Sequence, residues 1–508
     1  MSIQAPKAGD IILSENIFLT SYISEQGSNE PFRMDISELV QEIQLFEGIN
    51  YSTMAGAMVL VDASGVLDRL PLTGNELLEF TAHTPGFTPD ETKYPRGYDF
   101  TMQSGFPMFV YKVRNIAEPS PGVKTYVLEF CSKEKIKDSQ RKICRALEGP
   151  IHESIIKVLR KYLKSNKDLF YEKTNPVVKY VIPKKSPIDT IRFLGTEAIS
   201  DKFKSAGFFF WETSDGFHFK SLESMISNSS GVAKEPIAEY SNSPKIESGR
   251  MYRQKQGNSI IKGNMEKVFE FNILNRYDTL TNIEEGVYAS RIVTYDAFTK
   301  QHKEIDFSYP HEFTETTHMG QLSKDKTSET NSLMPIYNYE DDKLLSDFPE
   351  GKYMFVSSAI GMHDKKNETT GKITAIDTAA VENTLQKSIS QLGAFNSFAI
   401  EIVVPGNTAV TAGSVIDFET LTQTSPEKST LDPYMSGRYL VSEVRHLIQR
   451  PKTTPDHVMT LICIKDSVAK PYMKNDKELL NTEKTKDGLD IDQFKIDKGG
   501  ILVWHKTF

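Results

Sequence analysis

The sequence predicts a mainly β protein of the α+β class, in which a mixed helical region separates strand-rich regions. Long stretches alternate apolar and polar residues with the period of two that half-buried strands show, and clusters of Gly, Pro, Asn and Asp separate them. After about residue 141 the apolar spacing changes to that of helices. The 508 residues, 39% of them hydrophobic, are enough for roughly three domains.

Residues 31–140 are the first strand-rich region. In "MFVYKVRNIAEPSPGVKTYVLEFCS", two alternating runs flank the turn cluster "EPSPG". The apolar positions of these runs include Phe109, Tyr111, Val113, Tyr126, Leu128 and Phe130. A β-hairpin is therefore expected, and several strands of this length at close spacing suggest a small barrel or sandwich.

Two helices are expected in the middle region, 141–261. In "GPIHESIIKVLRKYL", Pro150 suits the first helical position, and apolar residues recur after it at helical spacing. In "SPIDTIRFLGTEAISDKF", Ser186 can cap the second helix and Pro187 opens it. An α+β domain is predicted here.

The rest of the chain divides by texture. Strand-like runs return over 262–310 and again over 395–470, which we interpret as one discontinuous domain. The stretch 311–394 between them is an insertion: its first part, to about 350, is polar and aperiodic and is expected to be a loop or extended arm, and a helix is expected near 379–393. Residues 1–30 are expected to form an N-terminal arm and 471–508 a polar C-terminal tail.

The densest aromatic stretch, "GFFFWETSDGFHFKSL" at 207–222, contains Glu212, Asp215 and His218. A cell-wall glycosidase would need two carboxylates that flank a cleft. With a period of two, however, the aromatic residues alternate about "TSDG", whose Asp-Gly pair favours a tight turn. We therefore expect a β-hairpin whose two acids lie at the turn and point away from the core rather than into a shared pocket.

No other segment suggests chemistry. The sequence lacks a phosphate-binding loop, a dinucleotide fingerprint, a zinc-protease helix and a nucleophile elbow. His302, His311 and His318 are interpreted as part of a solvated loop rather than a metal site. The three cysteines, Cys131, Cys144 and Cys463, are interpreted as buried free thiols. No catalytic residue, cofactor or metal is predicted.

The charge and the N-terminal sequence limit the partners and the location. A net charge of −8 disfavours a protein that holds nucleic acid by neutralising phosphates. "MSIQAPKAGDIILSENIF" has no secretory pattern, and no run approaches 18 apolar residues. We expect a soluble protein made in the cytoplasm, without a membrane partner.

Three consecutive segments near the C-terminus carry a family resemblance. "VVPGNTAVTAGSVIDF", "GRYLVSEVRHLI" and "HVMTLICIKDS" follow one another as a glycine turn, a G-x-x-I-x-F strand, a Y-x-V-x-x-V-x-H strand and a final apolar strand. This order resembles the closing strands of the second barrel in T4-type baseplate hub proteins of contractile-tailed bacteriophages. The matching positions include Gly406, Gly413, Tyr439, Val441 and His446.

Two earlier segments resemble the same family. "LFEGINYSTMAGAMVLVDASGVLDRLPLTGNELLEF" is similar to the first hub barrel, with Asp62, Gly74, Asn75 and Glu76 at the positions of its acidic and G-N-E residues. "NRYDTLTNIEEGVYAS" resembles the opening hairpin of the second barrel. Together the segments cover most of 30–470. The N-terminal arm, an insertion around 311–378 and the tail after Tyr472 depart from the shorter T4-type pattern.

The resemblance implies two tube-like antiparallel β-barrels with the α+β domain between them. It also implies a homotrimer that forms a ring in the baseplate of the virion and needs no catalytic residue. Such a ring joins the hexameric tail tube to the trimeric central spike, with baseplate wedge proteins and the tape measure protein as further partners. DNA would pass through its lumen during ejection without specific binding, and carboxylates on the wall would repel phosphates. Acidity is equally a common solubility feature.

Two questions stay open at this stage. Trp504 and Phe508 end an otherwise polar tail, so they are candidate anchors in a partner's groove, or part of a frayed terminus. A tail-associated cell-wall hydrolase is an alternative function from another class. The hub of a phage-derived contractile injection particle is a further alternative, which sequence separates poorly from an infectious phage.

Overall fold

A computed structural model describes most of the chain. The described residues are 8–22, 31–70, 72–85, 97–175, 177–228, 231–242, 264–296, 300–321, 331–332, 337–338, 343–358, 365–366, 373–374, 381–421, 431–450, 455–468, 494–496 and 502–504. Contacts divide the chain into one unit over Met1–Lys470 and a second over Pro471–Phe508.

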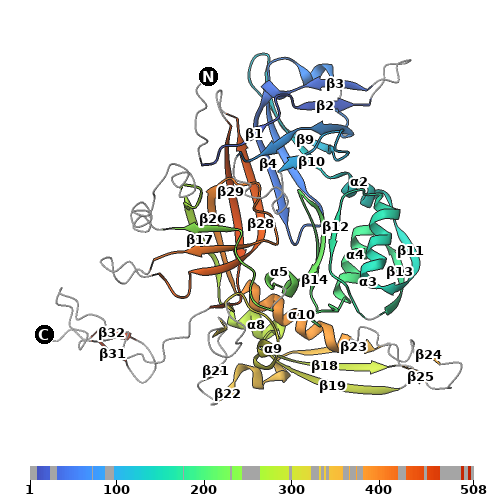
Figure 1. Ribbon diagram of the computed structural model, residues 1–508, viewed down its shortest axis with the longest axis vertical. Helices are drawn as coiled ribbons and strands as arrows, with labels where there is room; N and C mark the ends of the chain where they lie inside the picture. Colours follow the sequence, from blue (N-terminus) through green and yellow to red (C-terminus); the bar gives the residue numbers. More distant parts are fainter. Residues whose placement is uncertain are drawn as a thin grey trace. The chain divides into compact units, whose positions relative to one another are not determined.

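One large sheet dominates the first unit (Figure 1). Its strands follow the order β17-β26-β29-β28-β4-β5-β10-β9-β6-β2-β3, and β16 and β27 extend it from β28. The strands are β17 (Glu270–Arg276), β26 (Phe398–Pro405), β29 (Asp456–Ile464), β28 (Gly437–Gln449), β4 (Val40–Gly48), β5 (Ala55–Asp62), β10 (Val123–Cys131), β9 (Met108–Ser120), β6 (Glu76–Glu79), β2 (Phe18–Ser21), β3 (Phe32–Asp35), β16 (Ala238–Ser241) and β27 (Val415–Glu419).

The first predicted strand-rich region and most of the second meet in this sheet, whereas residues 289–296 and 301–308 of the second region pair with each other in a separate sheet. β28 pairs antiparallel with β4, from Glu443 opposite Gly48 to Gln449 opposite Glu42. Each side of this seam has its own apolar core, one built mainly from 395–468 and one from 11–130. The mainly β, α+β class is confirmed, and the predicted hairpin is β9 paired with β10. Among the described residues no pairing closes the sheet into a barrel.

A mixed module lies beside the large sheet. β11 (Ile143–Pro150) pairs with β13 (Val177–Lys185), and β12 (Leu169–Tyr171), β15 (Gly216–Ser221) and β14 (Phe208–Thr213) form a second small sheet. The helices are α2 (Lys133–Gln140), α3 (Ile151–Val158), α4 (Pro187–Thr196) and α5 (Leu222–Ile226). Ser186 caps α4 as expected, since its hydroxyl accepts from Asp189 N. Pro150 instead occupies the N-cap of α3, one position earlier than expected.

A third region follows β17. α8 (Thr279–Glu285) leads to a sheet of β19 (Gln301–Ser308), β18 (Ala289–Asp296) and β23 (Tyr353–Ser358), with α9 (Tyr309–Glu315) and α10 (Val381–Asn396) beside it (Figure 1). The helix expected near 379–393 is therefore confirmed as α10. A small sheet of β1 (Ile12–Leu13), β7 (Thr81–His83) and β8 (Tyr98–Asp99) borders the large one.

Three expectations differ from the structure. The predicted opening hairpin at "NRYDTLTNIEEGVYAS" contains α8 instead, because Asp278 accepts from Thr281 N at its start and Gly286 ends it at a φ of 81°. Part of the predicted N-terminal arm belongs to the sheet: β2 pairs with β3 and β6, and Leu19 is buried. The predicted loop after 311 begins as α9, and Thr317 is buried.

The second unit contains one described pair of strands. β31 (Phe494–Ile496) pairs antiparallel with β32 (Leu502–Trp504), and Trp504 lies opposite Phe494. Phe508 lies outside the described residues, so the anchoring role of both aromatic residues stays a prediction. Within the described ranges, no helix combines the length and apolarity needed to cross a membrane.

Candidate functional site

A chain of buried polar side chains crosses the seam between β4 and β28. Glu47 Oε1 lies 2.7 Å from Tyr98 Oη, which lies 2.8 Å from His446 Nε2. His446 Nδ1 lies 3.0 Å from His457 Nε2. All four side chains are at most 2% exposed. This hydrogen-bonded chain of four side chains links β4, β8, β28 and β29, and so connects the two apolar cores.

The single phenolic proton of Tyr98 sets the direction of this chain. When Glu47 is ionised, Tyr98 donates to it and must accept from His446 Nε2–H. His446 Nδ1 is then unprotonated and accepts from His457 Nε2–H. This leaves His457 Nδ1 without a proton, which fits the finding that no described residue forms a hydrogen bond with it. Both imidazoles are neutral in this arrangement.

Burial explains these protonation states. It raises the pKa of Glu47 to about 7, against the hydrogen bonds from Tyr98 and Ala412 N, which lower it. Burial lowers the pKa of His446 to about 3 and also lowers that of His457. The histidines therefore stay neutral over the physiological range, and Glu47 is the group of the chain that titrates near neutrality.

Glu212 belongs to a second buried cluster, contrary to the expectation that it points away from the core. It is 2% exposed. Its Oε2 accepts from Met54 N at 2.9 Å and from Ser132 Oγ at 2.6 Å, and its Oε1 pairs with the ammonium of Lys167. Lys167 also lies 3.4 Å from Glu134. The cluster thus connects the hairpin of β14 and β15 to β5 and α2.

The electrostatics of this cluster follow from one cation between two acids. Burial raises the pKa of Glu212. At Glu134 burial acts in the same direction, but the charge of Lys167 and hydrogen bonds, including one with Ser165, together outweigh it and the pKa is lowered. The pKa of Lys167 is raised because the two carboxylates outweigh its own burial. Lys167 is therefore firmly protonated, and Glu212 takes a proton before Glu134 as the pH falls.

The predicted hairpin is confirmed, but Glu212, Asp215 and His218 do not assemble as a catalytic triad. β14 and β15 pair antiparallel around the expected turn. Glu212 and Asp215 do line one cavity of about 100 Å³, which corrects the expectation that they share none. His218 is not among its lining residues; its ring stacks between Phe170 and Trp211, with centroids at 5.1 and 4.9 Å. Both oxygens of Glu212 already have protein donors, which suits a structural carboxylate.

The acidic residues of the first family motif hold tight turns. Glu76 is fully buried, and its carboxylate accepts from the backbone N–H groups of Thr73 (2.7 Å), Gly74 (3.0 Å) and Asn75 (3.1 Å). Asp62 accepts from Ser64 N at 2.9 Å and from Leu67 N at 3.1 Å. Gly74 has a φ of 84°, a conformation that favours glycine. The G-N-E sequence is thus a self-contained turn around one carboxylate.

The glycines of the second motif allow close packing at the junction. A Cβ on Gly406 would lie 2.0 Å from His457 Cγ, and one on Gly413 would lie 2.6 Å from Trp211 Cζ2. Trp211 Nε1 also donates to Ala412 O at 3.1 Å. Trp211 therefore fixes the mixed module against the turn that precedes β27. Tyr439 and Val441 lie in the core around β28, and the Tyr439 hydroxyl donates to Met435 O at 2.5 Å.

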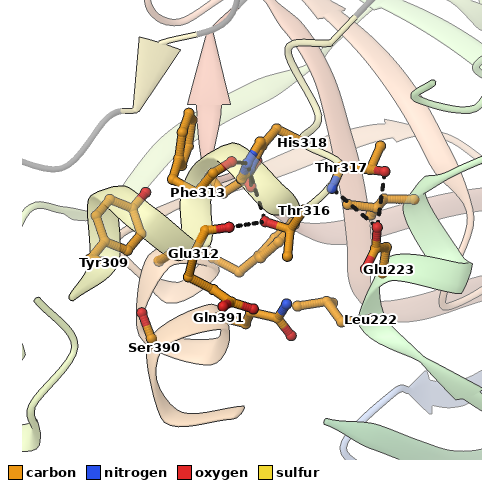
Figure 2. Close-up of a pocket in the computed structure, with 14 residues that line it drawn as sticks. Leu222, Glu223, Tyr309, Glu312, Phe313, Thr316, Thr317, His318, Ser390 and Gln391 are labelled. Carbon is orange, nitrogen blue, oxygen red and sulfur yellow. Dashed lines mark hydrogen bonds and ion pairs between the residues drawn. The ribbon is translucent and has the colours of Figure 1, made fainter. Parts of the chain in front are cut away.

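His318 follows α9 in a loop, but it is buried, which corrects its interpretation as part of a solvated loop. Its Nδ1 lies 2.6 Å from Asp466 Oδ2, and its ring stacks on Phe313 with centroids 3.7 Å apart. Figure 2 shows it at the edge of a small cavity between α5, α9 and α10, lined also by Glu223 and Glu312. The cavity is about 20 Å³, room for a single water molecule. His302 and His311, in contrast, are exposed.

The described residues contain no group of three or more His, Cys, Asp and Glu side chains that could hold a metal ion. The three cysteines are free thiols. Cys131 and Cys463 are buried as expected, whereas Cys144 is exposed. Cys144 lies on β11, where most side chains after Ile143 face solvent.

The sequence hypothesis missed most members of the two clusters. These members are Glu47, Tyr98, Glu134, Lys167 and His457. Within the two clusters, the partners of the first four are at least 33 residues away along the chain, whereas His457 is 11 residues from His446. One local signal could have indicated that Glu47 is buried. It directly follows Leu45 and Phe46, near the end of a run that alternates apolar and polar residues up to Gly48. Lys167 carries no comparable signal in a segment of mixed polarity.

The sequence matches no protein-family model and no curated protein. Several solved structures are similar. A tail protein from Neisseria meningitidis MC58 matches with a TM-score of 0.47 and 10% identity, over 89% of this chain and 97% of that one. The 43 kDa tail protein of prophage MuSo2 from Shewanella oneidensis matches with a TM-score of 0.44 and 8% identity, over 89% and 98%. An Escherichia coli component of the type VI secretion system, described as similar to T4 bacteriophage tail proteins, matches with a TM-score of 0.37 and 8% identity, over 86% and 76%. All three TM-scores lie below 0.5, so the role of this chain is argued from its own residues.

Proposed function

We propose that this chain is a structural protein of a phage-type contractile tail, the central hub of its baseplate. Three copies form a ring that adapts the hexameric tail tube to the trimeric spike and leaves a lumen for the genome. Wedge proteins and the tape measure protein are its further partners. The motif residues support a structural role, because Glu76, Gly406, Gly413 and His446 all serve packing or buried hydrogen bonds.

The open sheet carries this proposal. Within the described residues, β17 pairs only with β26 and β3 only with β2, so both strands lie at edges of the sheet, as β16 does on its branch beyond β27. The β17 edge carries exposed apolar residues. Ile273 and Leu274 on β17 are 46% and 51% exposed, and Phe269 just before it is 57% exposed. An apolar edge of this kind readily pairs with another chain. We infer that the β17 edge of one copy meets the β3 edge of the next, so that neighbouring copies complete the two tube-like barrels.

The two buried polar networks, the Glu47 chain and the Glu212 cluster, support a rigid ring subunit. The Glu47 chain and the Glu212 cluster join the two halves of the sheet and the mixed module through fully buried hydrogen bonds. Buried networks make a core rigid where their members are satisfied, as both oxygens of Glu212 are. The chain's net charge of −8 is consistent with a wall that DNA passes without binding.

Mass photometry of the full chain tests the ring. The expected particle has three times the 57.4 kDa chain mass. Ile273→Lys places a charge at the β17 edge and should shift the particles to single chains. Leu280→Lys is the matched control, because Leu280 is 75% exposed on α8, outside the sheet, and should leave the mass unchanged. Single chains in the native protein, alone and with spike protein added, would overturn the proposal.

A further inference from the structure

Within the part of the chain that the structure describes, the sheet of β19, β18 and β23 has one covered face and one open face. α10 covers the first, where Gln386 Nε2 donates to the carbonyl oxygens of Ser290 (3.0 Å) and Ile305 (3.3 Å). Side chains alternate along a strand, so the neighbours of these residues point away from α10. Arg291 on β18 is one of them, and Tyr353 lies opposite it on β23.

Three aromatic side chains gather on the open face. Phe355, Tyr295 and Tyr353 are 77%, 53% and 44% exposed. The rings of Tyr353 and Phe355 are nearly parallel, with centroids 6.2 Å apart and planes at 12°. Val293 lies directly opposite Phe355, which places Tyr295 diagonally next to Phe355 on the same face. Tyr353 and Phe355 therefore stand side by side, and Tyr295 occupies the next diagonal position, so the three residues make up one aromatic row on this face.

Hydrogen-bonding groups with fixed positions border this row. The guanidinium of Arg291 binds both carboxylate oxygens of Asp306, at 2.6 and 2.9 Å. It also lies 3.5 Å from Glu350 and 5.7 Å from the centre of the Tyr353 ring. Glu304, two residues before Asp306 on β19, shares the open face. The border thus offers donors and acceptors beside flat apolar rings.

We propose that this open face binds a neutral, linear glycan. The C–H face of a sugar ring stacks on an aromatic ring, while its hydroxyls bond to carboxylates and guanidinium groups at the edge. The charge on the face disfavours a phosphate polymer, because Arg291 stands against Glu304, Asp306 and Glu350. A row of rings along the strands matches an extended chain rather than a single sugar. This inference rests on the sheet alone and does not depend on the hub proposal.

Binding of the full chain to arrayed glycans tests the inference. The probes are neutral linear oligosaccharides of β-linked glucose, β-linked N-acetylglucosamine and α-linked glucose, with a single-stranded oligo-dT beside them. At least one neutral glycan should be retained. Loss of one stacked ring should weaken that binding about tenfold or more in Phe355→Ala, whereas Phe355→Tyr should retain it because the ring remains.

Tyr171→Ala is the matched control, because Tyr171 is 43% exposed on β12 and stacks on His152, away from this sheet. Its glycan affinity should equal that of the native chain. Retention of no neutral glycan, or equal retention by Phe355→Ala, would overturn the inference. Phe355-dependent binding of oligo-dT would overturn it as well. A change in particle mass on Phe355→Ala would identify the face as a contact between copies, and would likewise overturn it.

Discussion

Removing the ammonium of Lys167 should destabilise the protein far more than removing a surface ammonium. Lys167 is 9% exposed and stands between Glu134 and Glu212, which are 3% and 2% exposed. Lys167→Met keeps most of the side-chain volume but leaves two buried carboxylates without their cation. Breaking a buried ion pair from one side costs about 3–5 kcal/mol, because the remaining charge stays buried.

The matched control is Lys204→Met. Lys204 Nζ lies 3.6 Å from Asp201, and the two side chains are 67% and 55% exposed. An exposed pair of this kind contributes about 0–1 kcal/mol. The two variants remove the same chemical group, so their difference isolates the effect of burial.

Urea unfolding followed by fluorescence measures the difference. The chain has two tryptophans, so a Trp504→Phe background leaves Trp211, which lies in the same hairpin strand as Glu212, as the reporter. Lys167→Met should lower the unfolding midpoint markedly at pH 7, and adding Glu134→Gln and Glu212→Gln should restore much of it. Equal midpoints for Lys167→Met and Lys204→Met would refute the reasoning.

Three further outcomes are expected. Gly413→Ala should lower the melting temperature more than Gly122→Ala. Both glycines have a positive φ, at 84° and 77°, but only a Cβ on Gly413 would meet Trp211, and such overpacking costs about 1–3 kcal/mol. Equal shifts in melting temperature would contradict the contact. The folded-state pKa of Glu47, about 7, lies above the ordinary 4.5, so its stabilising contribution is complete below pH 4.5 and is lost as the pH rises through 7. Glu47→Gln should remove this fall in stability between about pH 4.5 and 7, and an unchanged pH profile would contradict the assignment. A peptidoglycan zymogram of the native chain should show no clearing, since both oxygens of Glu212 are bound by protein donors; clearing that Glu212→Gln abolishes would show a hydrolase.

Sequence reasoning succeeded where the determining interactions are local. The β14–β15 hairpin follows from alternation around a four-residue turn, and α4 follows from Ser186 and Pro187 at its start. It failed at Glu212 because the partners that bury this residue are distant: Lys167 is 45 residues away, Ser132 is 80 and Met54 is 158. A local pattern cannot predict that a residue next to a turn will be enclosed by three other segments.

The same limit applies to the seam. The family resemblance placed His446 on a strand, but its partner Tyr98 lies 348 residues away. The helix α8 was missed because a capped helix of seven residues is short enough to resemble a turn between strands. Under the hub proposal, neighbouring copies decide whether the two strand-rich regions close as barrels, and the pattern of a single chain carries no information about them.

A cryo-EM reconstruction of the assembled full-length chain tests the hub proposal most directly. We expect a ring of three copies around an open lumen, with β17 of each copy beside β3 of the next, so that the sheets continue around the ring. A particle with another number of copies, or a three-copy ring in which both edges face solvent, would contradict it.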